Sequence, residues 1–325
     1  MRIIFPTLII LTVFLFSIDI AVGSTSIPLH QVWEALTGQD CPPTVARIVV
    51  NIRLIKAIVA LLAGAAVSVS GLQMQTLFRN PLAGPYVLGI SSGASLGVAI
   101  FLLGAPLFGL SPTMSSLGIA GAAWIGSAIV LLIVGAVASR IKDIMVILIL
   151  GMMFSSGISA VVQILQYLSR DESLKAFVIW TMGSLGDVTF SQLRILLPAV
   201  IAGLFLAIIT IKPLNLLLFG EEYARTMGLH IRRSRTLLFL STTLLAGTVT
   251  AFCGPIGFIG LAMPHVTRML CRTSDHRVLV PATVLTGATV LLLCDIISKL
   301  LTLPINSITA LLGIPIVILV VLRTK

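Results

Sequence analysis

The sequence has few charged side chains. Only 10% of its 325 residues are Asp, Glu, Lys or Arg, against about 25% in an average soluble domain. A soluble chain of this length needs far more polar surface, so the composition excludes a cytosolic enzyme, a disordered protein and a nucleic-acid-binding domain, despite a net charge of +10. We interpret the excess of Lys and Arg as a sign of membrane topology.

Cysteine and the motifs of catalysis are also scarce. The four cysteines, Cys41, Cys253, Cys271 and Cys294, form no CxxC pair, so the sequence predicts neither a metal site nor a disulfide framework. It contains no Gly-x-x-x-x-Gly-Lys-Ser/Thr loop and no HExxH motif, the signatures of nucleotide and zinc chemistry. We therefore expect no catalytic residue, no metal and no cofactor bound by this chain, and any ATP hydrolysis would come from a partner.

Apolar stretches of bilayer length, in contrast, recur along the whole chain. A helix needs about 20 apolar residues to cross a hydrocarbon core of about 30 Å. The fold class that this predicts is an all-α polytopic membrane protein, with residues 1–325 as one transmembrane domain of about ten helices. The first stretch resembles a signal peptide, but it is long enough to span, and we take it as the first helix. The predicted spans are 3–22, 54–76, 85–103, 117–138, 144–168, 192–211, 236–253, 255–270, 278–299 and 307–322.

The distribution of Lys and Arg between these spans predicts the orientation. With the N-terminus inside, fourteen basic residues fall on the inner side and seven on the outer side, which favours two cytoplasmic termini. Spans 255–270 and 307–322 are short and contain or adjoin Gly and Pro. They either line a pathway or are ordinary short helices, and both interpretations stay open. If 54–168 and 236–322 are two four-helix repeats, they have opposite orientation, so an inverted repeat is expected from topology.

Residues 212–235 form a hydrophilic break between the sixth and seventh spans. Glu221 and Glu222 suit a helix N-terminus, Arg225 follows Glu221 at i+4, and Gly228 suits a left-handed C-cap. The pattern predicts a short cytoplasmic helix. It is either a docking surface that transmits force to a partner or a simple capped connector.

Several long motifs resemble the FecCD-type permease subunits of ATP-binding-cassette (ABC) importers, which take up iron-siderophore complexes, haem and cobalamin. These motifs occur in the family's order over essentially the whole chain: 79–85 (RNPLAGP), 88–94 (LGISSGA), 220–229 (GEEYARTMGL), 254–265 (GPIGFIGLAMPH) and 275–277 (DHR). The resemblance implies a type II importer permease in a bacterial inner membrane. It also implies the partners: a second copy of the chain, a cytoplasmic ABC ATPase dimer that uses ATP, and a periplasmic or surface-tethered substrate-binding protein.

The resemblance also assigns candidate residues for coupling and gating. The family's ATPase-coupling segment corresponds to Gly220, Glu221, Glu222, Ala224, Arg225, Gly228 and Leu229. The turn before the fifth span, with Lys142, Asp143, Ile144 and Met145, would lie at the cytoplasmic gate.

The fifth span has polar but uncharged side chains in an otherwise apolar sequence: Met152, Ser155, Ser156, Ser159 and Gln163. Such a face suits the wall of a pathway for a bulky complex, and in the family the fifth spans of two copies line the pathway. The alternative is hydrogen bonding between helices.

Three basic residues, Arg53, Lys56 and Lys299, lie at the outer ends of spans, where positive charge is normally depleted. In the family, basic residues at the matching positions receive acidic residues of the binding protein. The alternatives are snorkelling to lipid headgroups and, for Lys299, an i+4 ion pair with Asp295.

An ion-coupled secondary transporter is the second function class, because it also has about ten spans and inverted repeats. Such transporters place ionisable groups within the membrane, and Asp295 is the main candidate here. Among the family's cargoes we expect an iron complex first, and the sequence does not select between a ferric siderophore, haem and cobalamin.

Overall fold

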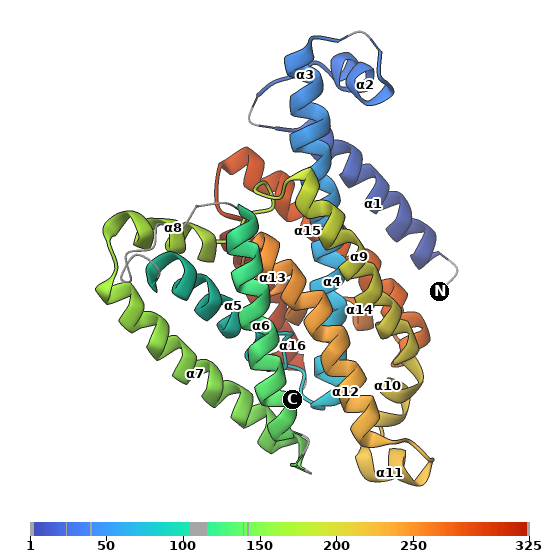
Figure 1. Ribbon diagram of the computed structural model, residues 1–325. Helices are drawn as coiled ribbons and strands as arrows, with labels where there is room; N and C mark the ends of the chain where they lie inside the picture. The colour runs from blue at the N-terminus through green and yellow to red at the C-terminus, as the bar shows by residue number, and fades with distance from the viewer. Residues whose placement is uncertain are drawn as a thin grey trace.

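A computed structural model describes residues 3–23, 25–39, 41–104, 116–138, 140–141 and 143–323. These residues form helices joined by short turns, without a strand among them (Figure 1). The helices are α1 Ile4–Ala21, α2 Leu29–Thr37, α3 Pro43–Ile48, α4 Ile55–Leu77, α5 Ile90–Ala99, α6 Ser116–Ala138, α7 Ile144–Leu168, α8 Asp171–Thr181, α9 Phe190–Ile209, α10 Ile211–Leu217, α11 Glu221–Thr226, α12 Ile231–Thr242, α13 Thr248–Cys253, α14 Ile259–Cys271, α15 His276–Leu301 and α16 Ile305–Arg323.

Each of the ten predicted spans overlaps a helix, so the all-α prediction is confirmed. Some of these helices are extended by π-helical turns that continue them directly: Val49–Leu54 joins α3 to α4, Ile100–Gly104 follows α5, and Thr243–Gly247 joins α12 to α13. Among the described residues, seven helices are long and apolar enough to cross a membrane, and the apolar helix Ile90–Gly104 is shorter. The predicted span 255–270 is short, since α14 has only 13 residues, whereas α16 has 19 and is longer than the predicted span 307–322.

The largest difference from the predicted spans is at the second one. The helix expected at 54–76 continues back to Pro43 and has 35 residues, because Pro42 and Pro43 supply the start of the helix and the π-helical turn Val49–Leu54 joins α3 to α4. Proline suits the first turn, where its missing N–H has no partner to lose. Two short helices lie outside the predicted spans: α2 beside α3 at one end of the molecule, and α8 after the upper end of α7 (Figure 1).

Helix α4 is the centre of the fold, and most of its residues are buried. It contacts α15 where Gly64 meets the backbone of Gly287, and α14 where Gly71 meets the backbone of Gly260. A Cβ atom at Gly71 would overlap the Gly260 carbonyl oxygen. Close approach of backbones at small residues stabilises helix pairs in lipid, where no hydrophobic effect acts between them.

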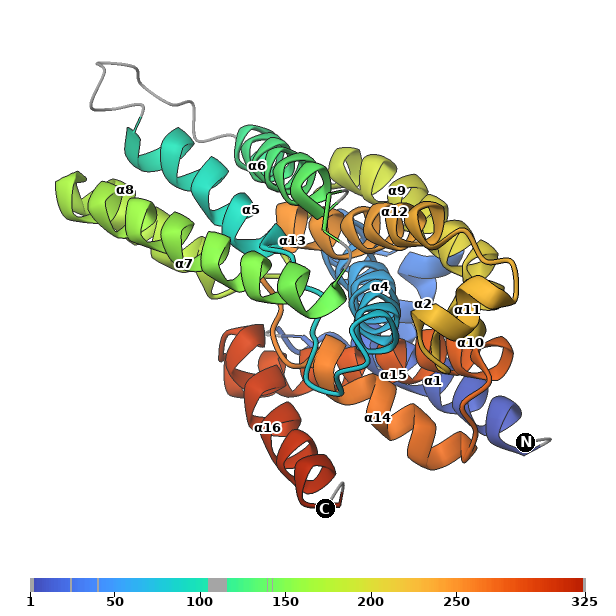
Figure 2. The ribbon, with the colours of Figure 1, turned by 90° about the horizontal axis from the view of Figure 1, so that it is seen from below.

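Helix α7 is the opposite case. Only Ile147, Leu148, Gly151 and Val162 of its 25 residues are buried. Seen from below, α7 and α16 lie on the same side of the molecule, away from α9 and α12 (Figure 2). Within the described residues, one long face of α7 therefore has no covering helix.

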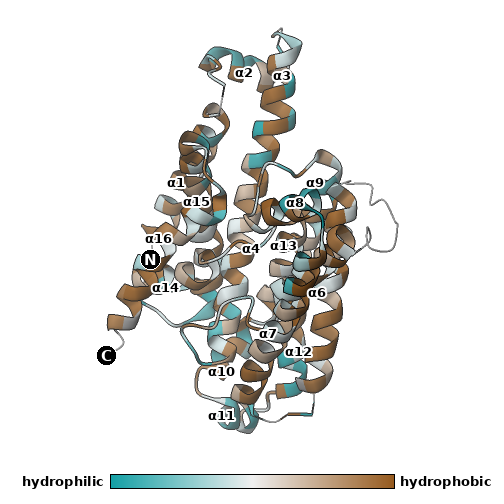
Figure 3. Cartoon of the chain, turned by 90° about the vertical axis from the view of Figure 1, so that its left-hand side faces the viewer, coloured by the Kyte–Doolittle hydropathy of each residue, from teal (hydrophilic) through white to brown (hydrophobic). Residues whose placement is uncertain are grey.

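Hydropathy divides the molecule into a middle and two ends. Apolar residues dominate the helices in the middle, and hydrophilic residues gather around α2 and α3 at one end and α10 and α11 at the other (Figure 3). We call these the α3 end and the α11 end. This distribution is what a protein that crosses a bilayer requires, since backbone and apolar side chains occupy the hydrocarbon region in helical form.

Candidate functional site

The helix α11 forms in the hydrophilic break as the sequence predicts. Gly220 precedes it with φ of 99°, Glu221 and Glu222 occupy its first turn, and Gly228 follows it with φ of 83°. The Leu229 N–H donates to the Ala224 carbonyl at 2.9 Å and the Gly228 N–H to the Arg225 carbonyl at 3.0 Å. These two bonds form a Schellman cap, whose left-handed position favours glycine. The C-cap predicted at Gly228 is confirmed.

The expected interaction between Glu221 and Arg225 is replaced by a longer-range one. Arg225 lies 3.5 Å from Glu222 instead, and both side chains are exposed. Glu221 binds Arg235 of α12 through two hydrogen bonds of 2.8 and 2.6 Å, and Arg235 also donates to the carbonyl oxygen of Ile141 at 3.1 Å. One guanidinium therefore joins α11, α12 and the segment that precedes α7.

Within the candidate coupling set, exposure separates two groups. Glu222 and Arg225 are exposed and Leu229 is half-buried, whereas Ala224 is 0% exposed and packs in the core formed with Leu214 and Leu217. The expectation that Ala224 belongs to a contact surface is corrected by this burial. A methyl group on the inner face of a short helix holds that helix against the protein.

Sequence reasoning missed three exposed apolar residues around α11. Phe219, Tyr223 and Met227 are 68%, 48% and 59% exposed, and the rings of Phe219 and Tyr223 lie 5.3 Å apart. Large apolar side chains exposed among charged ones are typical of protein interfaces. The signal was available in the sequence, where Tyr223 lies within the predicted charged helix and Phe219 and Met227 flank it.

The loops next to α11 are held by polar contacts. His265 bonds the Pro81 carbonyl oxygen at 2.8 Å, which gives this histidine a structural role. Asp275 caps α15 by accepting from the Arg277 N–H at 2.9 Å, and Asn215 donates to the same carboxylate oxygen at 2.6 Å. These two donors hold the pKa of Asp275 below its ordinary value.

The turn expected at the gate lies at the α11 end, next to Arg235. Asp143 is the N-cap of α7 and accepts from the Met145 N–H at 2.8 Å. Ile144 is half-buried and Met145 is 44% exposed. Lys142 lies outside the described residues.

The polar stripe on α7 has two parts. Met152, Ser156, Ser159 and Gln163 are exposed and share one helical face, because they are spaced by four, three and four residues. Ser155 is half-buried and lies next to Gly89, at the start of α5. The hydroxyls of Ser156 and Ser159 donate to carbonyls one turn back in α7 itself, those of Met152 and Ser155. These bonds are not the interhelical ones that the alternative interpretation expects.

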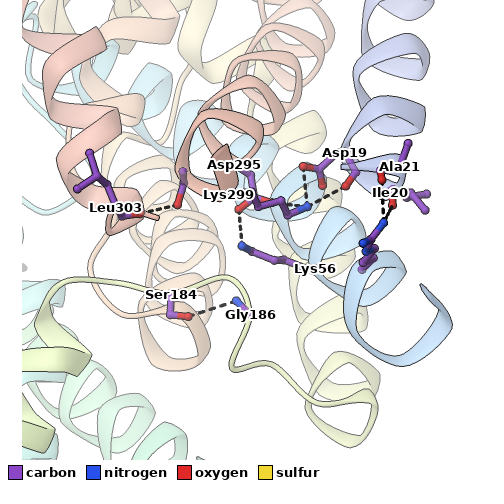
Figure 4. A network of polar contacts seen from close by, with 11 residues as sticks. Asp19, Ile20, Ala21, Lys56, Ser184, Gly186, Asp295, Lys299 and Leu303 are labelled. Carbon is purple, nitrogen blue, oxygen red and sulfur yellow. Dashed lines mark hydrogen bonds and ion pairs between the residues drawn. The ribbon is translucent and has the colours of Figure 1, made fainter. Parts of the chain in front are cut away.

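At the α3 end, two lysines and two aspartates form a buried ion-pair cluster (Figure 4). Lys299 lies 2.8 Å from Asp19 and 2.9 Å from Asp295, and Lys56 lies 3.0 Å from the other oxygen of Asp295. Both aspartates are 0% exposed, and the side chains of Lys299 and Lys56 are 7% and 20% exposed. The expected pair of Asp295 and Lys299 is therefore present within a larger cluster of zero net charge.

Arg53, one of the three predicted docking residues, is buried in the structure. It is 4% exposed, and its guanidinium donates to the carbonyls of Ile20 and Ala21 at the end of α1 and to that of Thr25 in the loop that follows. The last carbonyls of a helix lack donors within the helix. The hydrogen-bond donors that these carbonyls need explain the position of Arg53 without an external partner.

One string of residues has the letters of a catalytic motif. Residues 89–93 match Gly-x-Ser-x-Gly, which in hydrolases places the serine on a turn between a strand and a helix. Here the preceding residues, 81–88, form turns, and Ile90 begins α5. The strand that the motif requires is missing at this place, so the match carries no catalytic role.

Comparison with known families decides the identity of this arrangement. The sequence description of the FecCD transport family matches residues 9–323. The chain belongs to the FecCD transport family. As a FecCD-type permease of an ABC importer it is a transport subunit and not an enzyme, and this assignment replaces the secondary-transporter interpretation.

Relatives of this FecCD permease cover its full length. The hemin transport system permease HmuU of Yersinia pestis is 34% identical over 100% of this chain and 96% of its own. The vitamin B12 import system permease BtuC of Klebsiella pneumoniae is 38% identical over 98% of this chain and 92% of its own. A solved structure of a metal-chelate type ABC transporter, in an inward-facing conformation, is 29% identical with a TM-score of 0.85, covering 99% of both chains.

Sequence reasoning missed two charged residues of this FecCD permease. Asp19 is a carboxylate inside the first span, and such residues are candidates for function by default, but Asp295 was the only intramembrane carboxylate considered from the sequence. Arg235 was counted only toward the topology. Its partner Glu221 is 14 residues away, too far for a helical spacing rule to connect them.

Proposed function

We propose that this chain is the permease subunit of an ABC importer that works as a homodimer in a bacterial inner membrane. In this proposal α11 binds a cytoplasmic ATPase, both termini are cytoplasmic, and the α3 end receives a soluble substrate-binding protein. The cargo passes between two copies of the chain and is an iron complex, haem or cobalamin.

The observation that carries the proposal is the surface of α11. Phe219, Tyr223 and Met227 project from the end of the molecule, and Glu222 and Arg225 lie beside them with side chains 90% and 60% exposed. A well-capped helix with this mixture of apolar and charged groups fits a groove on a protein better than it fits water or lipid. Arg235 then connects this surface to Ile141 and the turn before α7.

The uncovered face of α7 supports a pathway between two copies. Ser156, Ser159 and Gln163 offer polar but uncharged groups beside Met152, and the Gln163 amide in particular would be poorly placed against lipid hydrocarbon. In a homodimer paired through the side that carries α7 and α16 (Figure 2), they would line the central space. Uncharged groups of this kind let a bulky complex pass without a tight site.

For the binding protein, the structure favours Lys56 over the other predicted docking residues. The Lys56 side chain is 20% exposed, whereas that of Lys299 is 7% exposed, and Arg53 is engaged at the end of α1. An acidic residue of a docked partner would compete with Asp295 for the Lys56 ammonium. Lysine forms such pairs as a point charge, without the bidentate geometry of arginine.

The cargo class rests on the names of the relatives, which are hemin, vitamin B12 and metal-chelate transporters. We place a ferric chelate first. Binding of a panel of ferric siderophores, haem and cobalamin to the cognate binding protein, followed by transport of the tight binders, decides between the three.

The decisive experiment is co-purification of the cognate ATPase with two tyrosine variants. Tyr223→Glu changes the proposed contact, and Tyr167→Glu changes a tyrosine of α7 that is 89% exposed and outside it. We expect Tyr223→Glu to lose the ATPase and Tyr167→Glu to retain it, with both proteins inserted and monodisperse. Equal retention of the ATPase by both variants would reject α11 as the coupling site.

A further inference from the structure

A cavity lies on the flank of the molecule at the α11 end. It has a volume of about 560 Å³ between α6, α12 and α11, within the range of about 300–1,000 Å³ found for ligand sites. Its lining shares Glu221, Arg225 and Arg235 with the proposed coupling region, but the apolar part of the space, between α6 and α12, is not used by the proposed coupling, gating, pathway or docking functions.

The inner wall of the cavity is apolar and belongs to membrane-spanning helices. Leu132 and Gly135 come from α6, and Phe239 and Leu240 come from α12. Both helices lie in apolar stretches long enough to span a bilayer. Leu132 is 70% exposed and Leu240 is 44% exposed, so the wall continues into the outer surface of the helix pair and opens sideways to the bilayer.

The wall is open at a glycine. A Cβ atom built on Gly135 meets no atom within 4 Å. A larger side chain therefore fits at this position and would fill part of the cavity without displacing a neighbour.

The mouth of the cavity carries positive charge. Its lining includes Arg225, Arg232 and Arg235 but only one acidic residue, Glu221. Arg235 already binds Glu221 through both carboxylate oxygens, so that pair adds no net charge. Arg225 lies 3.5 Å from Glu222, in an exposed pair. Arg232 is exposed and makes no ion pair within the described part of the chain, so it supplies the uncompensated positive charge of the mouth.

We infer that this cavity binds one anionic phospholipid from the leaflet at the α11 end. An acyl chain would lie along Leu132, Gly135 and Leu240, and the phosphate would face Arg232 and Arg225. The combination of an apolar groove that opens to lipid with cations at the interface matches this ligand and neither a zwitterionic lipid nor a soluble anion alone. Basic pockets between transmembrane helices bind anionic headgroups for the same reason.

The test is lipid binding to the purified, delipidated permease, measured by native mass spectrometry. The probes are phosphatidylglycerol and phosphatidylcholine with identical acyl chains, and inorganic phosphate as a third arm. We expect one phosphatidylglycerol to bind per chain at least fivefold more tightly than phosphatidylcholine, since one Arg near a membrane surface contributes about 1 kcal/mol. Equal binding of the two lipids would overturn the charge argument, and binding of phosphate alone at similar affinity would overturn the acyl-chain argument.

Two matched pairs of variants locate the site. Gly135→Trp fills the cavity, whereas Gly121→Trp lies on the same helix, also facing open space, outside the lining. Arg232→Gln removes a lining charge, whereas Arg233→Gln removes its exposed neighbour, which is not part of the lining. We expect the first of each pair to weaken phosphatidylglycerol binding about fivefold and the second to change it less than twofold. If Gly135→Trp does not fold, the arginine pair decides, and equal behaviour of Arg232→Gln and Arg233→Gln refutes the site.

Discussion

Arg235 binds Glu221 side-on, with Nε donating to Oε1 at 2.8 Å and Nη2 to Oε2 at 2.6 Å. The side chains are only 9% and 19% exposed, and the remaining terminal nitrogen donates to the Ile141 carbonyl at 3.1 Å. Bidentate pairs fix orientation as well as distance. A displacement of α11 is thus passed to α12 and to the start of α7 through one rigid group.

The first prediction concerns this link. Arg235→Met leaves Glu221 without its partner and should destabilise the permease by roughly 1.5–3 kcal/mol, the range for hydrogen bonds to charged groups. Import should fall more than ATP hydrolysis, because α11 would move without the turn before α7. Thermal unfolding and the ratio of cargo imported to ATP hydrolysed measure the two effects. Arg233→Met is the control, and a ratio equal to that of wild type in Arg235→Met would remove the link from the mechanism.

The second prediction concerns the cluster at the α3 end. Lys299→Met removes the cation shared by Asp19 and Asp295, so the two buried carboxylates lose a positively charged partner. Breaking a buried ion pair lowers the free energy of unfolding by about 3–5 kcal/mol. Lys56→Met should cost less, because its side chain is 20% exposed and Lys299 still faces Asp295. Adding Asp19→Asn to Lys299→Met should recover part of the loss. Thermal unfolding in detergent gives the order of the variants, and a larger loss in Lys56→Met than in Lys299→Met contradicts the assignment.

The third prediction separates packing from contact on α11. Ala224→Trp forces a large ring into a site that is 0% exposed, so it should lower the unfolding temperature, since overpacking costs about 1–3 kcal/mol. Glu222→Arg changes a side chain that is 90% exposed and should leave stability unchanged while weakening ATPase binding. Parallel melting and pull-down measurements test both. A stable Ala224→Trp protein would mean that α11 is not held as the structure shows.

The fourth prediction concerns the polar face of α7. Ser156→Trp and Ser159→Trp should block import by filling the space between two copies, with stability unchanged because both positions are exposed. Ile164→Trp is the control: Ile164 is 60% exposed but lies about 100° around the helix from that face. Import assays in vesicles compare the three. Uninhibited import in both serine variants places the pathway elsewhere.

The sequence predicted elements well where a local rule governs them. Hydropathy located the long helices, and glycine with an acidic first turn located α11 and its C-cap at Gly228. The helices α2 and α8 were not predicted, because they are short and contain polar residues. They have neither the length of a membrane span nor a clear helical period in their hydrophobic residues. Their position depends on tertiary packing, such as the burial of Phe177 in α8.

Side-chain direction was harder to predict than position. Ala224, Arg53 and Ser155 were placed correctly along the chain, but the structure turns each toward the protein. A six-residue helix allows no period to be read, and the carbonyls at the end of α1 that bind Arg53 are about 30 residues away. Long-range partners of this kind, like Asp19 with Lys299, are set by the fold and leave no spacing signal in the sequence.

The length of the helix Pro43–Leu77 restricts how a protein can approach the α3 end. Its 35 residues extend about 52 Å at 1.5 Å per residue, roughly 20 Å more than a hydrocarbon core of about 30 Å. The excess stands beyond the rest of the bundle with α2 at its side (Figure 1), and Lys56 lies near its base. A protein that contacts Lys56 must approach parallel to this protruding helix. Only a partner that is narrow on the side facing the helix, and oriented so that it does not collide with α2, can make the contact.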